Sequence, residues 1–352
     1  WGIIDPIDTP DGGNVGLHKS MTITATVTKG YSAKPMIKWL RTNASMLLLN
    51  ECTPIILSKL CKVMVNGQWV GVLAQPREIE ERMKMLRRVA VIPTFTSIYW
   101  NVKNNTLFIY TDAGRICRPV FYVDGTNHKP SYNNESVIEK INKDDFTWEQ
   151  LISGFAKKKD ENFNFKNENL YNRVADLYNA TDLKDLSASK GLIDYLDTSE
   201  TEGALIAMDY DIMKAHEKPY THVEIHPSLM LGVLGNQVIF PENNQLPRNL
   251  FACGQSKQAI SLYHSNYPVR VDQTGIVLNN GQTPLVKSRY LKYINNEEHP
   301  CGENTIVAIM SYNGYNVEDS ILFNEGSVKR GLFRTTYFSL YENREESERI
   351  GN

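Results

Sequence analysis

The chain has 352 residues, more than one hydrophobic core usually serves, so roughly two to four domains are expected. Hydrophobic residues make up 41% and charged residues 22%, as in ordinary globular proteins, and no apolar run reaches the length of a membrane span. The five cysteines are scattered without a C-x-x-C pair, a pattern that argues against a disulfide framework or a zinc site and is typical of reduced thiols in an intracellular protein.

The net charge of −2 conceals an uneven distribution. Residues 133–218 contain 18 acidic and 11 basic side chains, whereas residues 236–293 contain 2 acidic and 6 basic ones. The basic segment is therefore a candidate for facing phosphates. Charge alone does not establish nucleic-acid binding, because such imbalances are also common on solvated surfaces.

The first 29 residues begin with a turn-rich stretch, residues 6–16, whose prolines and glycines predict a rigid, irregular loop. Residues 21–28 alternate as a strand does.

Residues 30–125 have the pattern of a compact α/β module. Residues 63–72 predict a β-hairpin with Asn66-Gly67 at its turn. Residues 76–88 predict a helix with proline near its start and arginines in its last turn. Two further strands are expected at 98–101 and 106–110.

The next part of the chain, residues 126–218, is polar and acidic. Helices are expected near 147–156 and 170–178, and the lysine run 157–159 is expected to be a solvated, mobile loop.

Thr221–Pro227 alternates as a strand and carries His222, Glu224 and His226 on one face. This H-x-E-x-H spacing on a strand can bind zinc, but no fourth ligand follows nearby. The pattern therefore favours a structural or partner-contacting polar face over a metal site.

Residues 250–261 predict a helix with Arg248 at its N-terminal end and Lys257 and Gln258 further along. Later, two apolar runs, 305–310 and 321–323, flank a Gly/Asn-rich loop that ends in Glu318-Asp319. Adjacent carboxylates at the end of a strand can offer oxygen ligands to a divalent cation beside a phosphate. The alternative is a surface turn whose Asn and Asp side chains bond their own backbone.

Taken in order, these motifs resemble the middle of the second-largest subunit of multisubunit DNA-dependent RNA polymerases. Asp8 and Asp11 stand where that family usually has glutamate. Each motif is weak evidence alone, but their collinear order over the whole chain is specific. The segments that carry the resemblance are Trp1-Gly2, Pro6–Gly12, Gly16-Leu17, Val65–Gly67, Thr111–Arg115, Arg118-Pro119, Gly191–Asp197, Ala207-Met208, Thr221–Glu224, Pro227, Pro247–Asn249, Lys257–Ala259 and Gly314–Ser320.

The resemblance implies a multidomain α+β or mixed α/β fold. Residues 1–29 would be the end of the fork, 30–125 the first external domain and 126–235 the second. Residues 236–352 would be the first part of the hybrid-binding domain, with an incomplete double-psi β-barrel, because the chain ends before the family's later lysine motifs. Asp8, Thr9, Pro10 and Asp11 would form a rigid turn that shapes the fork.

The resemblance also implies a share in nucleotidyl transfer, which proceeds by a two-metal displacement. In this family three aspartates of the largest subunit hold the main Mg²⁺, and their motif is absent from this chain. Glu318 and Asp319 match the acidic pair that assists a second, nucleotide-borne magnesium, largely through water. Arg248 matches the arginine that contacts the phosphates of the incoming nucleotide. Lys257 would contact the nucleic-acid backbone, and Gln258 would lie near the RNA 3′ end.

The partners implied are the largest subunit and other polymerase subunits, template DNA, the RNA–DNA hybrid and nucleoside triphosphates, with no membrane and no zinc in this fragment. Pro247–Gln258 departs from the cellular pattern and is more similar to versions in large nucleocytoplasmic DNA viruses. A viral enzyme would work in the virion or the host cytoplasm, and a cellular one in the nucleus.

Two readings from other classes remain open. One is a stand-alone nucleic-acid-binding protein that uses the basic segment. The other is a non-catalytic scaffold whose external domains hold other factors. A self-sufficient enzyme is disfavoured, because the phosphate-cradling and nucleophile motifs of such enzymes are absent.

Overall fold

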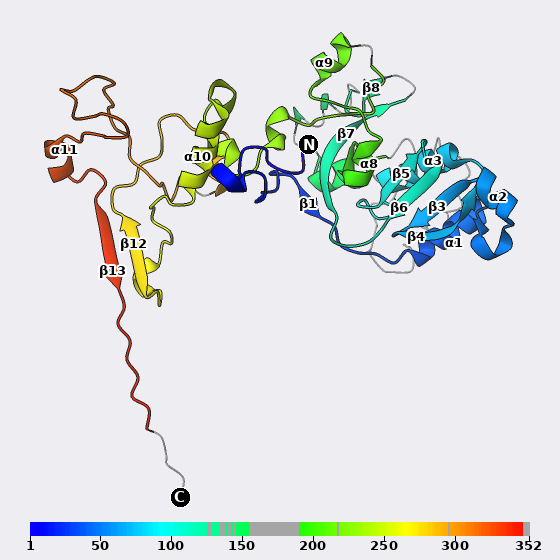
Figure 1. Cartoon of the computed structure of the whole chain (residues 1–352), viewed down its shortest axis with the longest axis horizontal. Coiled ribbons are helices and arrows are strands. Elements are labelled where there is room, and N and C mark those ends of the chain that lie inside the picture. Colours follow the sequence, from blue (N-terminus) through cyan, green and yellow to red (C-terminus); the bar gives the residue numbers. More distant parts are fainter. Residues whose placement is uncertain are drawn as a thin grey trace, which may run out of the picture. The chain divides into compact units, whose positions relative to one another are not determined.

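The computed structural model describes residues 1–125, 128–133, 138–139, 142–143, 146–154, 190–216, 218–294 and 296–347. The chain forms two compact units (Figure 1). The first contains Trp1–Ile3 and Ile23–Met230, and the second contains Ile4–Thr22 and Leu231–Asn352. The bounds of the four predicted domains stay predictions. So do the helix at 170–178 and the loop at 157–159, which lie outside the described residues.

The first unit contains a five-stranded sheet with the order β2-β4-β3-β6-β5. Helices α1 (Lys34–Asn43) and α3 (Pro76–Arg88) pack on it, and α2 (Pro54–Lys59) precedes β3. The strands are β2 (Leu47–Leu48), β3 (Cys61–Val65), β4 (Gln68–Leu73), β5 (Ser97–Asn101) and β6 (Thr106–Tyr110).

Local signals in this region predict the structure well. The hairpin β3–β4 is confirmed, and its turn residues Asn66 and Gly67 have φ values of 48° and 78°, as an Asn-Gly hairpin turn requires. The helix at 76–88 is confirmed with its predicted bounds, and the two later strands are confirmed as β5 and β6.

The core of this unit lies between the sheet and the two helices. Trp39 and Leu40 of α1 and Met83 of α3 are buried against apolar strand residues such as Val63 and Leu107. Each such side chain contributes roughly 1.5–3 kcal/mol by leaving water.

The second sheet of the first unit is built around one long strand, β7 (Ile116–Asp124). Its partners are β1 (Thr26–Val27), β8 (Lys129–Pro130), β9 (Ile193–Asp197) and β11 (His222–Val223), and β10 (Ile206–Ala207) pairs with β11. Three short helices accompany it: α5 (Trp148–Ser153), α8 (Thr198–Glu202) and α9 (Tyr210–Ala215).

Strand predictions in this sheet were too long. The strand expected at 21–28 is reduced to Thr26–Val27, because only these residues pair with β7. The strand expected at 221–227 is reduced to His222–Val223 for the same reason. The helix expected at 147–156 occurs as α5, which ends at Ser153 before Gly154.

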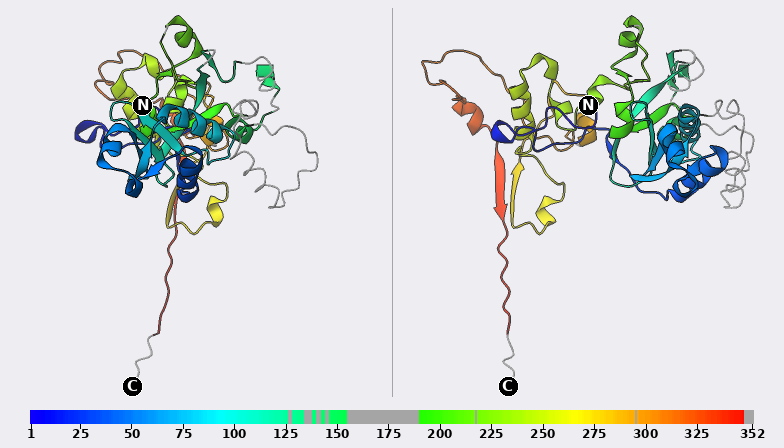
Figure 2. Two further views of the ribbon diagram at one scale, coloured as in Figure 1. Left: turned by 90° about the vertical axis from the view of Figure 1, so that its right-hand side faces the viewer. Right: turned by 45° about the vertical axis from the view of Figure 1, so that its right-hand side comes forward.

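The second unit has few regular elements within its described residues, shown from two further sides in Figure 2. Helix α10 (Leu246–Ser256) is followed by β12 (Thr274–Leu278), α11 (Glu325–Lys329) and β13 (Thr335–Ser339). β12 and β13 pair antiparallel over five residues each. The helix predicted at 250–261 thus starts earlier and ends earlier, since Pro247 fits a first helical turn, where no amide partner is needed.

The two apolar runs around the acidic loop do not form strands, contrary to the expectation of a strand end. Residues 305–310 and 321–323 have no regular structure, and Ile306 and Ile309 are fully exposed. A strand needs a neighbouring strand to pair its amides and carbonyls, and no described strand pairs with either run.

The fold as a whole is mixed α/β with several sheets, as predicted. The double-psi barrel stays a prediction. Among the described residues, no helix is both long and apolar enough to span a bilayer.

Candidate functional site

The turn at the start of the second unit is organised by a buried carboxylate, Asp5. Its Oδ1 accepts the amide hydrogen of Ile7 and its Oδ2 accepts that of Gly232, each at 2.8 Å. A Cβ on Gly232 or Gly235 would lie under 3.0 Å from Asp5 Oδ2, so the backbone approaches this carboxylate closely only because both residues are glycines. Asp5 was not predicted as a functional residue, because its only signal in the sequence is a lone acid after Ile3 and Ile4.

The predicted fork residues lie just after Asp5. Thr9 Oγ1 donates to the carbonyl of His18 at 3.0 Å and accepts the amide hydrogen of Gly16 at 2.9 Å, which closes the loop. Asp8 is buried and its Oδ1 lies 2.9 Å from Nζ of Lys257, at the end of α10. Pro10 is half-buried and Asp11 is exposed.

Cys253, one turn before Lys257, is buried close to the same acids. Burial, together with the negative charges of Asp8 and Asp5, raises the pKa of its thiol to about 11. The thiol therefore stays protonated near neutral pH and serves as a small apolar group.

Arg248 lies in the first turn of α10 with its side chain exposed. Its guanidinium lies 5.5 Å from the ring centre of Phe251, and it has no ion-pair partner among the described residues. The neighbouring Asn249 is buried and donates to the carbonyl of Pro241 at 2.9 Å, so the start of the helix is anchored while Arg248 faces outward.

The acidic loop is closed by Asn316 rather than by its carboxylates. Asn316 Nδ2 donates to the carbonyl of Met310 at 2.6 Å, and its Oδ1 accepts the amide hydrogen of Tyr312 at 3.2 Å. Glu318 has a φ of 56°, so the backbone is bent between the two acids.

Both Glu318 and Asp319 are exposed. In the part of the chain that is described, no hydrogen bond or ion pair joins either of them to Arg248, Lys257 or Gln258. The structure thus brings Lys257 to Asp8 and leaves Arg248 and the acidic pair as separate exposed features of the second unit.

The residues of the H-x-E-x-H pattern each have a different partner. His222 Nδ1 lies 2.9 Å from Thr221 Oγ1, and His226 Nδ1 lies 2.6 Å from Ser228 Oγ. Glu224 forms a buried ion pair with Arg118 at 2.6 Å. Among the described residues no cluster of three or more His, Cys, Asp or Glu side chains has the arrangement of a metal site. The buried pair of Glu224 with Arg118 is the kind of contact that the structural interpretation of this strand expects.

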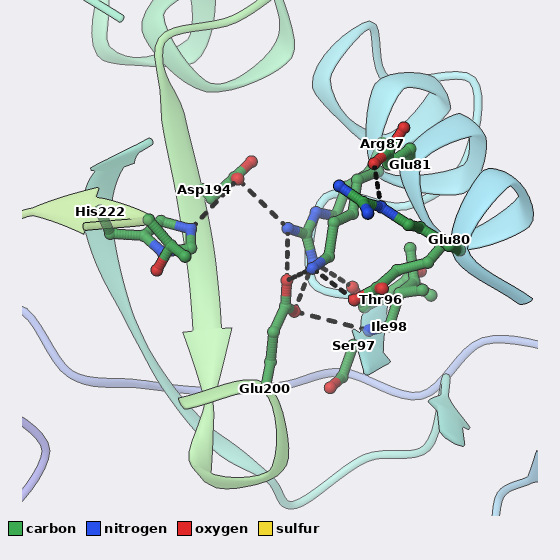
Figure 3. Close-up of polar contacts among 12 residues, drawn as sticks. Glu80, Glu81, Arg87, Thr96, Ser97, Ile98, Asp194, Glu200 and His222 are labelled. Carbon is green, nitrogen blue, oxygen red and sulfur yellow. Dashed lines mark hydrogen bonds and ion pairs between the residues drawn. The ribbon is translucent and has the colours of Figure 1, made fainter. Parts of the chain in front are cut away.

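A buried cluster of charged residues in the first unit was not predicted from the sequence (Figure 3). Arg87 of α3 donates to both carboxylate oxygens of Glu200, at 2.7 and 2.9 Å, and to the carbonyl of Thr96 at 2.8 Å. Asp194 of β9 forms ion pairs with two arginines. Its Oδ2 lies 2.6 Å from Arg88 Nη2 and 3.4 Å from Arg87 Nη2.

The two arginines decide the charge state of Asp194. Burial alone would raise the pKa of this carboxyl, but the positive charges of Arg88 and Arg87 outweigh burial and hold it well below its usual value. His222 Nε2 lies 3.6 Å from Asp194 Oδ2, and burial lowers the pKa of this histidine although Asp194 acts in the opposite direction. The cluster joins α3 to β9 and α8 and is a structural centre of the first unit.

Comparison with known families identifies domains over most of the chain. Four family models match in order: RNA polymerase Rpb2 domain 3 at residues 1–27, domain 4 at 63–124, domain 5 at 184–227 and domain 6 at 234–351. Arg248, Lys257, Gln258, Glu318 and Asp319 all lie within the domain 6 match.

Individual relatives agree with these matches. The chain is 33% identical to the DNA-directed RNA polymerase II subunit RPB2 of Schizosaccharomyces pombe over 98% of its own length and 29% of the relative. It is 34% identical to RNA polymerase II subunit 2 of Arabidopsis thaliana over 100% of its own length and 27% of the relative. The archaeal subunit Rpo2 of Sulfolobus acidocaldarius is 29% identical over 98% of this chain and 28% of its own.

The chain therefore spans less than a third of the length of these relatives. The Rpb2 domain matches follow one another in numerical order from 3 to 6. The chain belongs to the family of second-largest RNA polymerase subunits, of which it carries the segment from domain 3 to domain 6.

Proposed function

We propose that this chain is the part of a DNA-directed RNA polymerase that contacts the triphosphate of the incoming nucleotide, working together with a largest subunit and further polymerase subunits. The observation that carries the proposal is Arg248, an exposed guanidinium at an anchored helix start inside the Rpb2 domain 6 match. The main catalytic aspartates lie in the partner subunit, so the chain alone is inactive.

The local chemistry of Arg248 suits a phosphate. A guanidinium stays charged at all relevant pH values and presents a planar fork of donors to phosphate oxygens. It lies in the first turn of an 11-residue helix, where the helix dipole also favours an anion. Because Asn249 fixes the helix start, the arginine can meet a ligand without reorganising the backbone.

Glu318 and Asp319 fit a role beside a nucleotide-borne Mg²⁺. Carboxylate oxygens are ligands that Mg²⁺ accepts, and it keeps several waters when bound. Two exposed carboxylates on a bent loop do not complete a coordination shell, so the phosphates and the largest subunit would supply the rest. Bound there, the ion would neutralise charge on the triphosphate.

The finer assignments follow from the same resemblance. Lys257 contacts the nucleic-acid backbone, Gln258 lies near the RNA 3′ end, and residues 236–352 supply part of a hybrid-binding double-psi barrel. Residues 30–235 are the two external domains. The departures in Pro247–Gln258 point to a large DNA virus as the source and to a virion or host-cytoplasm enzyme.

The test is Arg248→Ala in the assembled polymerase. Loss of a charged contact to the transferring phosphates should lower kcat/KM for single-nucleotide addition by roughly one to three decades. Arg248→Lys should recover only part of this, because it restores the charge without the planar fork. Arg270→Ala is the matched control: Arg270 lies in the same basic segment but is ion-paired to Asp272 at 2.9 Å.

Unchanged kinetics for Arg248→Ala would overturn the proposal. A stand-alone nucleic-acid-binding role, suggested by the basic segment 236–293, would then show as tight, steeply salt-dependent binding of DNA or RNA by the isolated chain. A pure scaffold would show neither defect nor binding.

A further inference from the structure

The ion pair between Asp8 and Lys257 joins two residues for which separate roles were predicted, one in the fork turn and one in contact with the nucleic-acid backbone. Asp8 belongs to the fork turn, and Lys257 follows α10 as its C-terminal cap residue. Asp8 Oδ1 lies 2.9 Å from Lys257 Nζ although 249 positions separate them in the chain. The turn and the candidate nucleic-acid contact therefore meet at one pair of atoms.

The two partners differ sharply in exposure. The Asp8 side chain is 10% exposed, whereas that of Lys257 is 57% exposed. Asp8 is held in place by its surroundings: Thr9 closes the following loop, and the neighbouring Asp5 binds the amides of Ile7 and Gly232. Asp8 is therefore anchored by its surroundings, and it orders the ammonium of Lys257, whose side chain is otherwise exposed.

An ammonium group has three donors and no acceptor. The contact with Asp8 uses one of them, and the exposure of Lys257 leaves the others free for a second acceptor. A lysine side chain that is already ordered loses less conformational entropy on binding than a free one. A phosphate oxygen is an acceptor that such a pre-positioned ammonium can take.

We propose that Asp8 is a positioning residue, which holds the ammonium of Lys257 where it donates to a phosphate of the bound nucleic-acid backbone. This inference rests on the proposed function, because it deepens the role given to Lys257. It also replaces the purely structural role that sequence analysis gave to Asp8.

Competition between Asp8 and the phosphate for Lys257 would change the strength of nucleic-acid binding in the opposite direction. Asp8 also cancels part of the lysine's charge, so an Asp8 that merely competed with phosphate would weaken binding. Removing its charge would then strengthen the complex. If Asp8 positions Lys257, removing its charge weakens the complex, because the ammonium loses its place.

The experiment uses the assembled polymerase with four forms of this subunit: unaltered, Asp8→Asn, Lys257→Met and the double variant. Elongation complexes are stalled on one fixed RNA–DNA scaffold, and their half-life is measured at rising KCl. Lys257→Met should shorten the half-life and reduce the log–log salt slope by about one, as the loss of one phosphate contact does. Asp8→Asn should shorten it roughly three- to tenfold, as the loss of one well-placed charge-assisted contact does.

The double variant should have the same half-life as Lys257→Met, because Asp8 can act only through the ammonium that this substitution removes. Asp8→Glu keeps the negative charge, so its half-life should be close to that of the unaltered subunit and longer than that of Asp8→Asn. The matched control is Glu325→Gln with Lys329→Met, an exposed carboxylate–lysine pair of the same unit at 2.6 Å, for which no coupling is expected. Thermal unfolding of each subunit checks that the substitutions leave the fold intact.

A longer half-life for Asp8→Asn, an unchanged one, or losses that multiply in the double variant would each overturn the inference. An unchanged half-life for Lys257→Met would overturn it as well. In every such case a defective Arg248→Ala enzyme would leave the proposed function standing, so the two failures are distinguishable.

Discussion

The two units use the same residue types in opposite ways. In the first, Arg87 at the end of α3 is 2% exposed and is enclosed by Glu200, Asp194 and the carbonyl of Thr96. In the second, Arg248 at the start of α10 is exposed and has no ion-pair partner among the described residues. Both arginines lie on helices, so helix position alone does not explain the difference.

The difference shows which charges are available to a ligand. A buried arginine whose donors are bound to carboxylates contributes to the specificity of the fold, and removing either partner leaves an uncompensated charge. An exposed arginine without a carboxylate contributes little to folding and retains its donors for a partner. Variants that remove a buried or an exposed charged or titratable group test this contrast.

The largest effect is expected for Arg87→Met. Removing Arg87 leaves Glu200 buried without its main partner, which should lower the free energy of unfolding by about 3–5 kcal/mol in urea denaturation of the chain. Arg77→Ala on the same helix is the control, because its pair with Glu81 is exposed and should contribute less than about 0.5 kcal/mol. Equal losses would break the distinction between enclosed and exposed charges.

A smaller effect is expected for Asp319→Asn in the assembled polymerase. If Asp319 assists a nucleotide-borne Mg²⁺ through water, the half-saturating Mg²⁺ concentration should rise, by about tenfold or less, since one such contact contributes about 1 kcal/mol. The measurement is a magnesium titration of elongation rate, with the exposed Glu325→Gln as control. A titration like that of the unaltered enzyme would argue against this role.

The smallest effect is a pH dependence that comes from His222. Burial lowers the pKa of this histidine in the folded chain. Below pH 6.5 His222 is therefore protonated more readily in the unfolded chain than in the folded one. Stability should therefore fall as the pH drops below 6.5, and a second loss at lower pH should follow from Asp194, whose pKa lies well below 3.8.

His222→Gln should flatten the upper part of this dependence in urea unfolding measured from pH 7 to pH 5. The exposed His226→Gln is the matched control and should leave the slope in place. A slope that survives His222→Gln would assign the dependence to another group.

The elements that were predicted correctly are those whose signals come from residues close together in the sequence. The Asn66-Gly67 turn and the helix at 76–88 were correct because their signals, a turn dipeptide and a proline at the helix start, act locally. The pairing of Arg87 with Glu200 spans 113 positions and has no local signal. Arg87 was therefore used only as a sign of the helix end, and no role was predicted for Glu200. The strand lengths at 21–28 and 221–227 failed for a related reason, since strands end where their partners end.

The candidate site shows the same division. Arg248, Glu318 and Asp319 were predicted from motif order, and their roles stay predictions. The backbone is bent at Glu318, as the sequence analysis requires of adjacent acids that share one ion. Asp5 and the contact of Asp8 with Lys257 were not predictable, because they arise from segments more than 200 residues apart.

The interleaved boundaries of the two units constrain how the chain can be dissected. The chain passes between the units three times, after residues 3, 22 and 230, so a single cut anywhere leaves at least one unit without a piece of itself. A product that starts at residue 231 would lack Asp5, and the amide of Gly232 would lose its acceptor. Recombinant expression of the second unit by itself therefore requires residues 4–22 to be grafted ahead of residue 231.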